Sequence, residues 1–326
     1  MIKILFLTKG IHSSSARYRA LFYQDFFIKD KYLTAHYGLS KKISNYLLAI
    51  INAARFDIVF LQRKLVPIPY FFILRFLAKK IIYDFDDAIF LNSNGDLSKK
   101  RYKRFKYICE KSDLIFSGNQ YLQSFAKKIN SQTFILPTCI NTKAYQVKAN
   151  KSKEFIDLVW VGHKSTIKYL LAVIPNLEKA NEKIKKLRII NISNVALSSK
   201  KIKIKNIPWD EMSQYKHIKS AWLGLAPLDD SNWSKGKCAF KILQYSAAGI
   251  PILSSNVGVN SKLISHYKNG YLIKKDSDWE KYILKLMANK NLYKNMMKNS
   301  ENLAKDYDYK KNYIRLLTII KKQSTS

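Results

Sequence analysis

Lysines cluster around a short glycine-containing turn in the C-terminal half of the chain. The sequence LGLAPLDDSNWSKGKCAFKILQYSAAGIPILSS begins at Leu223 and contains Lys235, Gly236, Lys237 and, one helical turn later, Lys241. The first turn of a helix has free N–H groups and a positive dipole end, so it attracts phosphate. A glycine lets an anion approach the backbone closely. The turn could therefore bind a phosphorylated ligand, although a solvated basic helix end is the alternative in so lysine-rich a chain.

A second group of residues that could do chemistry is acidic. Asp84, Asp86 and Asp87 lie in the sequence YDFDDAIF, directly after an apolar segment. One possibility is that Asp86 and Asp87 bind a ligand at the end of the preceding strand. A structural alternative is that Asp87 caps a helix while Asp84 is buried. A third possibility is a Mn²⁺ or Mg²⁺ site, because hard cations prefer oxygen ligands.

Strands and helices must position these residues. Residues 223–227 and 250–254 have the composition of buried parallel strands, and residues 238–248 have that of the helix connecting them. Residues 80–85 form a strand that ends in the aspartates. Residues 156–161 form another strand, which is followed by Gly162, Lys164 and Ser165. The pattern predicts an α/β fold with the polar residues at the carboxyl ends of parallel strands, where such folds bind ligands.

The lysine-rich segment resembles the donor-binding region of retaining GT-B glycosyltransferases of the group 1, or family 4, type. It contains Ala226-Pro227, then KGKCAFK over residues 235–241, then QYSAAGIPI over residues 244–252. Most relatives have two acidic residues eight positions apart, where this chain has Gly236 and Gln244. The chain is therefore a variant of the pattern, in which Gln244 can still hydrogen-bond a ribose hydroxyl.

This resemblance implies a GT-B fold, in which two Rossmann-like domains face one another across a cleft. Residues 1–145 would form the acceptor-side domain and residues 154–305 the nucleotide-sugar-binding domain. A C-terminal helix within residues 306–326 would pack back on the first domain. The implied reaction moves a sugar from a nucleotide-diphospho-sugar to a hydroxyl of a glycan or lipid-linked acceptor with retained configuration, in the assembly of a bacterial surface polysaccharide or glycan. It implies no metal or other cofactor.

The resemblance also assigns roles to single residues. Asp86 or Asp87 would face the sugar ring, while Lys237 and Lys241 would stabilise negative charge on the leaving diphosphate. The residues expected to bind the donor are Gly162, Lys164, Ser165, Trp209, Lys235, Gly236, Cys238, Ala239, Phe240 and Gln244.

Three of these assignments have structural alternatives. Arg17 and Arg19 would lie near the acceptor or the donor phosphates, but they could also be exposed residues of a serine-capped helix. Trp209 could stack on the nucleobase or pack structurally.

Composition suggests a membrane partner but does not require one. The chain of 326 residues has a net charge of +35, and only nine of its 58 basic residues are arginine. An AT-rich genome would give such a lysine excess without any function. Alternatively, the charge attracts an anionic membrane, and helix 99–110 could lie on lipid through Tyr102, Phe105 and Tyr107 or be a plain surface helix. No zinc, RNP or helix-turn-helix motif indicates a nucleic-acid partner.

The expected location is the cytoplasm, with possible peripheral contact to the inner membrane. Three scattered cysteines indicate a reducing compartment. No apolar segment is long enough to span a bilayer. Two rival functions remain: a GT-B sugar-nucleotide epimerase, which would release free sugar nucleotide, and a non-catalytic basic protein that binds membranes or polyanions, with a steep salt dependence.

Overall fold

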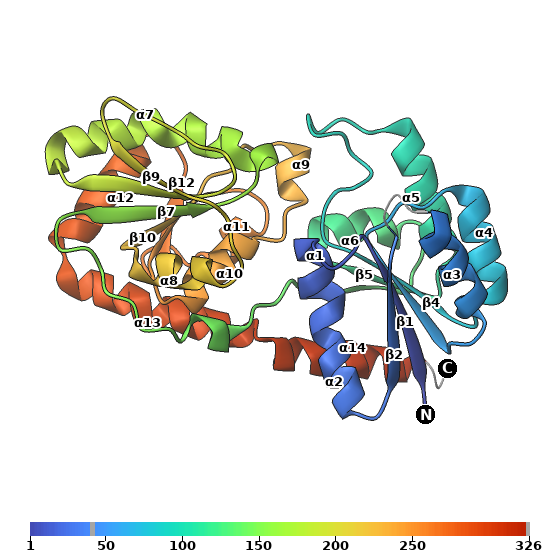
Figure 1. Cartoon of the computed structure of the whole chain (residues 1–326). Helices are drawn as coiled ribbons and strands as arrows, with labels where there is room; N and C mark the ends of the chain where they lie inside the picture. The colour runs from blue at the N-terminus through green and yellow to red at the C-terminus, as the bar shows by residue number, and fades with distance from the viewer. Residues whose placement is uncertain (40–42, 324–326) are drawn as a thin grey trace. The chain divides into compact units, whose positions relative to one another are not determined.

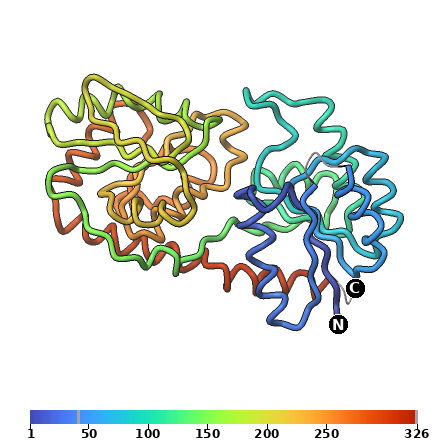
Figure 2. The backbone as a smooth tube through the Cα atoms, viewed as in Figure 1, coloured from blue at the N-terminus to red at the C-terminus, as the bar shows by residue number. Residues whose placement is uncertain are grey.

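The computed structural model describes residues 1–39 and 43–323. It divides into two compact units (Figure 1). Unit 1 comprises residues 1–139, 231–238 and 309–326, and unit 2 comprises residues 140–230 and 239–308. The first and the last described segments of the chain, residues 1–39 and 309–323, therefore both belong to unit 1 (Figure 2).

Unit 1 is built on a six-stranded sheet in which all neighbouring strands are parallel, in the order β2-β1-β3-β4-β5-β6. The order reverses between β1 and β3, because the chain adds β2 on one side of β1 and all later strands on the other. Four of the strands are buried apolar runs, as parallel strands covered on both faces usually are. The strands are β1 (Lys3–Thr8), β2 (Leu33–Gly38), β3 (Ile58–Gln62), β4 (Ile81–Phe85), β5 (Leu114–Ser117) and β6 (Thr133–Ile135).

Helices cover both faces of this sheet, because alternate strand residues point to opposite faces. Leu5 and Leu7 of β1 pack in a core with α3, α4 and α5, whereas Phe6 contacts Phe27 of α2. Helix α14 lies beside α2, where Tyr313 stacks on Phe26. The helices are α1 (Ser14–Ala16), a π-helical turn (Arg17–Leu21), α2 (Phe22–Lys29), α3 (Ile43–Ala53), α4 (Ile68–Leu77), α5 (Lys99–Lys111), α6 (Gln120–Lys127), α9 (Asn232–Lys235) and α14 (Tyr309–Lys322).

Unit 2 also has a parallel six-stranded sheet, in the order β12-β11-β10-β7-β8-β9. The order reverses between β7 and β10. Helices α7 and α12 pack on one face of the sheet, and α8 and α10 on the other. The strands are β7 (Ile156–Val161), β8 (Leu187–Ile192), β9 (Lys203–Ile207), β10 (Leu223–Ala226), β11 (Ile252–Ser255) and β12 (Gly270–Ile273). The helices are two 3₁₀ turns (Thr142–Tyr145 and Lys164–Thr166), α7 (Ile167–Ile184), α8 (Ser213–Ser220), α10 (Phe240–Ala247), α11 (Asn260–Leu263), α12 (Ser277–Ala288) and α13 (Lys290–Asp306).

Two parallel sheets with interspersed helices confirm the predicted α/β, Rossmann-like class.

The division of the chain differs in detail from the predicted boundaries. Unit 2 begins at Ile140, within the predicted first domain of residues 1–145, and the short segment 231–238 groups with unit 1. The C-terminal helix α14 packs on α2 within unit 1. No helix of the described residues is long and apolar enough to cross a bilayer.

Candidate functional site

A buried ion pair fixes the carboxyl end of β4 in unit 1. Arg19 donates from Nε to Oδ2 of Asp84 at 2.8 Å and from a terminal nitrogen to Oδ1 at 2.5 Å, and it also donates to the Leu136 carbonyl at 2.9 Å. The side chains of Arg19 and Asp84 are 1% and 0% exposed. Burial raises the pKa of Asp84 to about 6, against the opposing effect of Arg19. Arg19 therefore acts here as a support for Asp84, and its role at an acceptor or phosphate stays a prediction.

Asp87 accepts from two cations. Its carboxylate pairs with the guanidinium of Arg63 and lies 2.9 Å from the ammonium of Lys237. Arg63 directly follows β3 and has a left-handed backbone (φ 63°), which is uncommon for a residue with a Cβ and often marks a functional site. Arg63 also donates to the Ser15 hydroxyl at 3.1 Å. The carboxyl ends of β3 and β4 and the helical start after β1 are thus joined by one charged network.

Asp86 is the neighbouring carboxylate, and it lies among charged groups that include Arg63 and Asp87. Its Oδ1 lies 3.9 Å from Nε of Arg63 and has no hydrogen-bond partner. Burial raises the pKa of Asp86 above its usual range. The thiol of Cys238 donates to the main-chain carbonyl of Asp86 at 3.1 Å, and burial raises the pKa of this thiol too. Cys238 therefore contacts the aspartate segment, while its predicted contact with the donor stays a prediction.

Residues 231–238 are held within unit 1 by side chains of that unit. Asn119 donates to the carbonyls of Gly236 at 3.3 Å and Lys237 at 3.1 Å. A Cβ on Gly236 would lie 2.6 Å from the Cβ of Ala88, so the glycine allows close packing of this segment on the residues after β4. Gly236 was predicted to let an anion approach the backbone, but close packing on Ala88 is a sufficient reason for the glycine.

The helix after this segment begins later than predicted. We expected it to start at Cys238, but α10 starts at Phe240, because Ala239 has a left-handed backbone (φ 54°) that interrupts the helical path. Lys235 instead ends the short helix α9, and Lys237 lies outside both helices. Phe240 and Lys241 are in the first turn of α10.

In unit 2 the predicted residues gather where the strand order reverses. Strand β7 is the first strand of this sheet along the chain. It is followed by Gly162, Lys164 and Ser165, which lead directly into α7. A Cβ on Gly162 would lie 2.3 Å from the Trp160 ring, so this position requires glycine. The 18-residue helix α7 therefore starts just beyond the carboxyl end of the central strand, which is the place where open α/β sheets bind anionic ligands.

Tyr245 places α10 on the sheet of unit 2. Its hydroxyl donates to the Leu225 carbonyl at 3.0 Å and accepts from the Val161 amide at 3.2 Å, so it joins β10 to β7. Its ring fills the space beside Gly224, where a Cβ would lie 2.4 Å from the ring. The first turn of α10 is thereby fixed at the carboxyl ends of the two central strands.

The other predicted residues of unit 2 have packing partners of their own. Lys241 lies over the Trp160 ring, with its Nζ 5.4 Å from the ring centroid. Gln244 is buried and donates to the side chain of Gln214 at 3.1 Å. Trp209 follows β9, and its ring centroid is 6.4 Å from that of His163. The predicted contacts of Gln244 with ribose and of Trp209 with the base therefore stay predictions.

The predicted residues are divided between the two units. Unit 1 holds a charged cluster, and unit 2 holds the glycine and lysine residues around β7 and α10. Arg17 lies in the π-helical turn of unit 1, with its guanidinium 5.9 Å from the Tyr18 ring centroid. Sequence reasoning missed Arg63 and Tyr245. Arg63 could have been found from its place directly after a buried strand, but no sequence pattern indicated the role of Tyr245.

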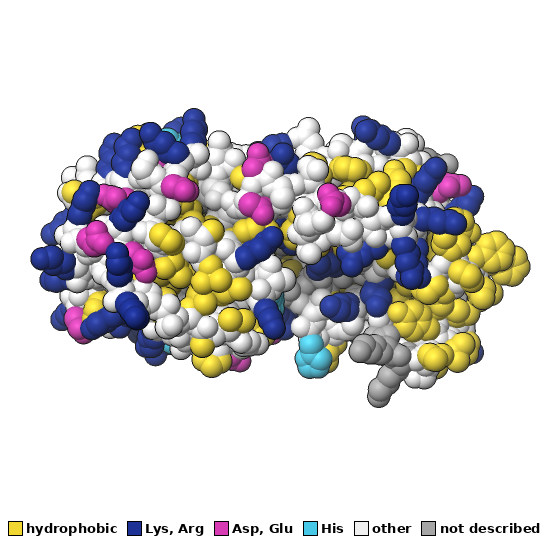
Figure 3. Space-filling view, turned by 90° about the horizontal axis from the view of Figure 1, so that it is seen from above, with side chains coloured by type: hydrophobic (Ala, Val, Ile, Leu, Met, Phe, Trp, Pro, Cys, Tyr) yellow, Lys and Arg dark blue, Asp and Glu magenta, His cyan; other side chains and the backbone are white. Residues whose placement is uncertain are grey.

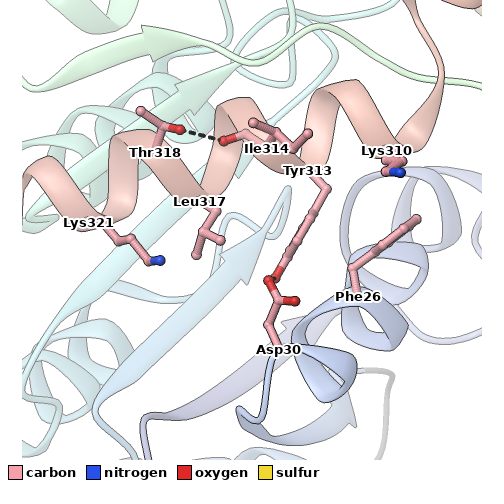
Figure 4. A pocket seen from close by; sticks show the side chains of 8 residues that line it. All are labelled: Phe26, Asp30, Lys310, Tyr313, Ile314, Leu317, Thr318 and Lys321. Atoms are coloured by element: carbon pink, nitrogen blue, oxygen red, sulfur yellow. Dashed lines mark hydrogen bonds between the residues drawn. The ribbon is translucent and has the colours of Figure 1, made fainter.

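A pocket of about 290 Å³ lies elsewhere in unit 1, between α2 and α14 (Figure 4). Tyr313 donates to Asp30 at its floor at 2.6 Å, and Lys310 and Lys321 also line it. None of its lining residues belongs to either group of predicted residues, so we do not assign it to the candidate site.

Residues 147–303, which cover most of unit 2 and slightly less than half of the chain, match the family described as glycosyl transferases group 1. A search of curated proteins gives no match.

Several solved protein structures have a similar fold. HepE of Anabaena in complex with UDP-glucose is 12% identical, with a TM-score of 0.76 over 100% of both chains. Sucrose-phosphate synthase of Thermosynechococcus elongatus is 10% identical, with a TM-score of 0.75 over 100% of both chains. A UDP-forming α,α-trehalose-phosphate synthase of Burkholderia xenovorans is 8% identical, with a TM-score of 0.73 over 100% of both chains. These neighbours show the fold of the chain, and the family match shows that residues 147–303 are similar to group 1 glycosyl transferases.

Proposed function

We propose that this chain is a glycosyltransferase that moves a sugar from a nucleotide-diphospho-sugar to an acceptor hydroxyl. The observation that carries the proposal is the family match over residues 147–303, which contain Gly162, Lys164 and the first turn of α10 at the reversal point of the sheet. In the reaction, the acceptor oxygen bonds to the anomeric carbon, the bond from that carbon to the diphosphate breaks, and the hydroxyl proton is released. We propose retention of configuration, by resemblance to the group 1 enzymes.

The residues of unit 2 would bind the donor. Lys164 and Lys241, with the N-termini of α7 and α10, would stabilise the charge that develops on the leaving diphosphate. HepE binds UDP-glucose, and the trehalose-phosphate synthase forms UDP, so UDP-sugars are the first donors to test. Trp209 would lie against the nucleobase and Gln244 against the ribose.

The charged cluster of unit 1 would act on the sugar. Asp86 or Asp87 would contact its ring, and Arg63 and Lys237 hold Asp87 in position. An ammonium has three N–H donors, so Lys237 can hold Asp87 and also contact the leaving diphosphate.

The acceptor we propose is a glycan or lipid-linked sugar used to build a bacterial surface polysaccharide. A lipid-linked acceptor would bring the chain to the cytoplasmic face of an anionic membrane, and the net charge of +35 favours that location.

A thermal-shift panel tests donor binding. UDP-, GDP-, dTDP- and CMP-linked sugars are added to the wild type, Lys241→Met and the control Lys200→Met, which removes an exposed lysine of the same unit. We expect one nucleotide class to stabilise the wild type and the control but not Lys241→Met. Equal stabilisation of all three proteins would remove Lys241 from the donor site, and no stabilisation by any donor would count against the proposed function.

Turnover then tests Lys237. Lys237→Ala should lose most of the transfer of labelled sugar to the acceptor while its unfolding transition stays close to that of the wild type. Full activity in this variant would exclude Lys237 from the site.

A further inference from the structure

Helices α3 and α4 of unit 1 expose an unusually apolar surface. Their 21 residues include one charged side chain, Arg75, which pairs with Asp113. Ile43 and Phe76 are 76% and 82% exposed. Figure 3 shows hydrophobic side chains gathered in one continuous area of unit 1, bordered by basic side chains. We call this surface the α3–α4 patch; its large exposed members are Ile43, Leu47, Leu48, Ile51, Phe72, Ile73 and Phe76.

The patch is not explained by the core beneath it. Ala49 and Ala53 of α3 and Phe71 and Leu74 of α4 already face the core. Each helix therefore has one apolar face that packs in the core and a second apolar face that is exposed to solvent. Contiguous apolar surface of this kind usually marks a protein or membrane contact.

The two helices present this face as one unit. Tyr46 of α3 and Tyr70 of α4 pack edge to face, with ring centroids 5.0 Å apart. Phe72 and Phe76 lie one helical turn apart on α4, so both side chains project from the same side of that helix.

A basic helix lies next to the patch. Helix α5 packs on α4 through Tyr107 and Phe71, whose ring centroids are 6.1 Å apart. It carries seven Lys or Arg residues and one Glu. Its aromatic residues do not face outward as the sequence suggested, because Phe105 is fully buried and Tyr102 and Tyr107 pack against the core. Of the two alternatives considered for this helix, the burial of its aromatic residues favours a plain surface helix, whose exposed residues include Lys103 and Lys106.

We propose that the α3–α4 patch inserts its apolar side chains into the interface of an anionic phospholipid membrane while α5 contacts the headgroups. An apolar face beside lysine and arginine is the arrangement of helices that lie in the membrane interface. A second copy of the chain fits this surface poorly, because it would bring two such basic helices together in a protein of net charge +35. The proposed function places the chain at a membrane, and this inference names the surface that would contact it. The inference does not depend on glycosyl transfer.

Vesicle co-sedimentation of the full chain tests the proposal, with vesicles of phosphatidylcholine alone and of phosphatidylcholine mixed with phosphatidylglycerol. Phe72→Ser/Phe76→Ser removes apolar contacts, and Lys103→Gln/Lys106→Gln removes charge. Leu171→Ser/Met212→Ser is the matched control, since it removes two exposed apolar side chains of unit 2.

The wild type and the control should bind the anionic vesicles and bind phosphatidylcholine alone much less. The phenylalanine variant should bind about a hundredfold more weakly, on the order of tenfold for each aromatic side chain that no longer inserts. The lysine variant should bind about twenty-five-fold more weakly at low salt, from about fivefold for each lysine near the surface.

Three results would overturn the proposal. The wild type could ignore anionic vesicles, or the phenylalanine variant could bind as well as the wild type. Light scattering could also show a dimer that the phenylalanine variant breaks, which would make the patch an interface between copies. Donor-induced thermal shifts should persist in the phenylalanine variant, so failure of this inference and failure of the proposed function give different results.

Discussion

Replacing Arg19 by Met should destabilise unit 1 strongly, because it leaves the carboxylate of Asp84 buried without a cation. The pair is 1% and 0% exposed and is joined by two short hydrogen bonds. Removing one partner of such a buried pair costs about 3–5 kcal/mol. The double variant Arg19→Met/Asp84→Leu replaces the pair by apolar side chains and should recover most of that loss, since apolar replacements of buried ion pairs are often close to neutral.

The loss in Arg19→Met should also depend on pH in a definite direction. The pKa of Asp84 is about 6 in the folded wild type, above its ordinary value of 3.8, and Arg19 lowers it. Without Arg19 the folded-state pKa rises further, so the folded variant binds a proton that the unfolded chain releases. Stability from this group is therefore present below the unfolded pKa and is lost as pH rises through the folded pKa. The variant should be less impaired near pH 5 than near pH 8, on either side of the folded pKa of the wild type.

Hydrogen exchange read by mass spectrometry can follow β1, β3 and β4 separately from unit 2, which matters because two units need not unfold together.

Arg188→Met is the matched control. Arg188 makes a similar two-point contact with Asp157 at 2.7 and 3.0 Å, but the arginine is 22% exposed. Asp157 is itself only 7% exposed, so the loss of Arg188 should cost more than the roughly 1 kcal/mol of an exposed pair but less than the loss of the fully buried Arg19. The reasoning fails if Arg19→Met costs no more than Arg188→Met, or if the double variant is as unstable as the single one.

Three further outcomes can be measured directly. Gly224→Ala should lower the free energy of unfolding of unit 2 by about 1–3 kcal/mol, because the new Cβ would overlap the Tyr245 ring; an unchanged denaturation midpoint would contradict this packing. The Cys238 thiol should react slowly with iodoacetamide in the native protein and quickly in denaturant, because burial raises its pKa; fast native labelling, located by mass spectrometry, would refute it. Asn312→Ala should loosen α14, since Asn312 donates to the Tyr23 hydroxyl at 2.9 Å, and should cost about 1–3 kcal/mol; unchanged protease resistance of α14 would show that this hydrogen bond is dispensable.

The strands that carry the candidate residues could be predicted because they are short, apolar and buried. Residues 80–85 and 156–161 were expected as strands, and they form β4 and β7 with ends displaced by at most one residue. The strand at 33–38 was missed. It is the half-buried edge strand of unit 1, with the mixed sequence LTAHYG, so it lacks the apolar run that identifies a buried strand.

The candidate site was harder to predict because its contacts join distant residues. Arg19 and Asp84 are 65 positions apart, and Asp87 and Lys237 are 150 positions apart. Neither spacing carries a signal in a single sequence. The start of α10 was misplaced for a local reason, since an alanine rarely adopts the left-handed conformation found at Ala239.

The balance of acidic and basic side chains in the unit 1 cluster affects whether it can bind a metal ion or a neutral sugar. Each acidic side chain has a cation close by: Asp84 is paired with Arg19, Asp86 lies near Arg63, and Asp87 is shared by Arg63 and Lys237. A Mn²⁺ or Mg²⁺ site needs carboxylates whose negative charge is available to the ion. A sugar is neutral, and its hydroxyls can donate to the carboxylates and accept from the cations without disturbing the charge balance. This balance supports the proposed contact of Asp86 or Asp87 with a sugar over the metal site that the sequence also allowed.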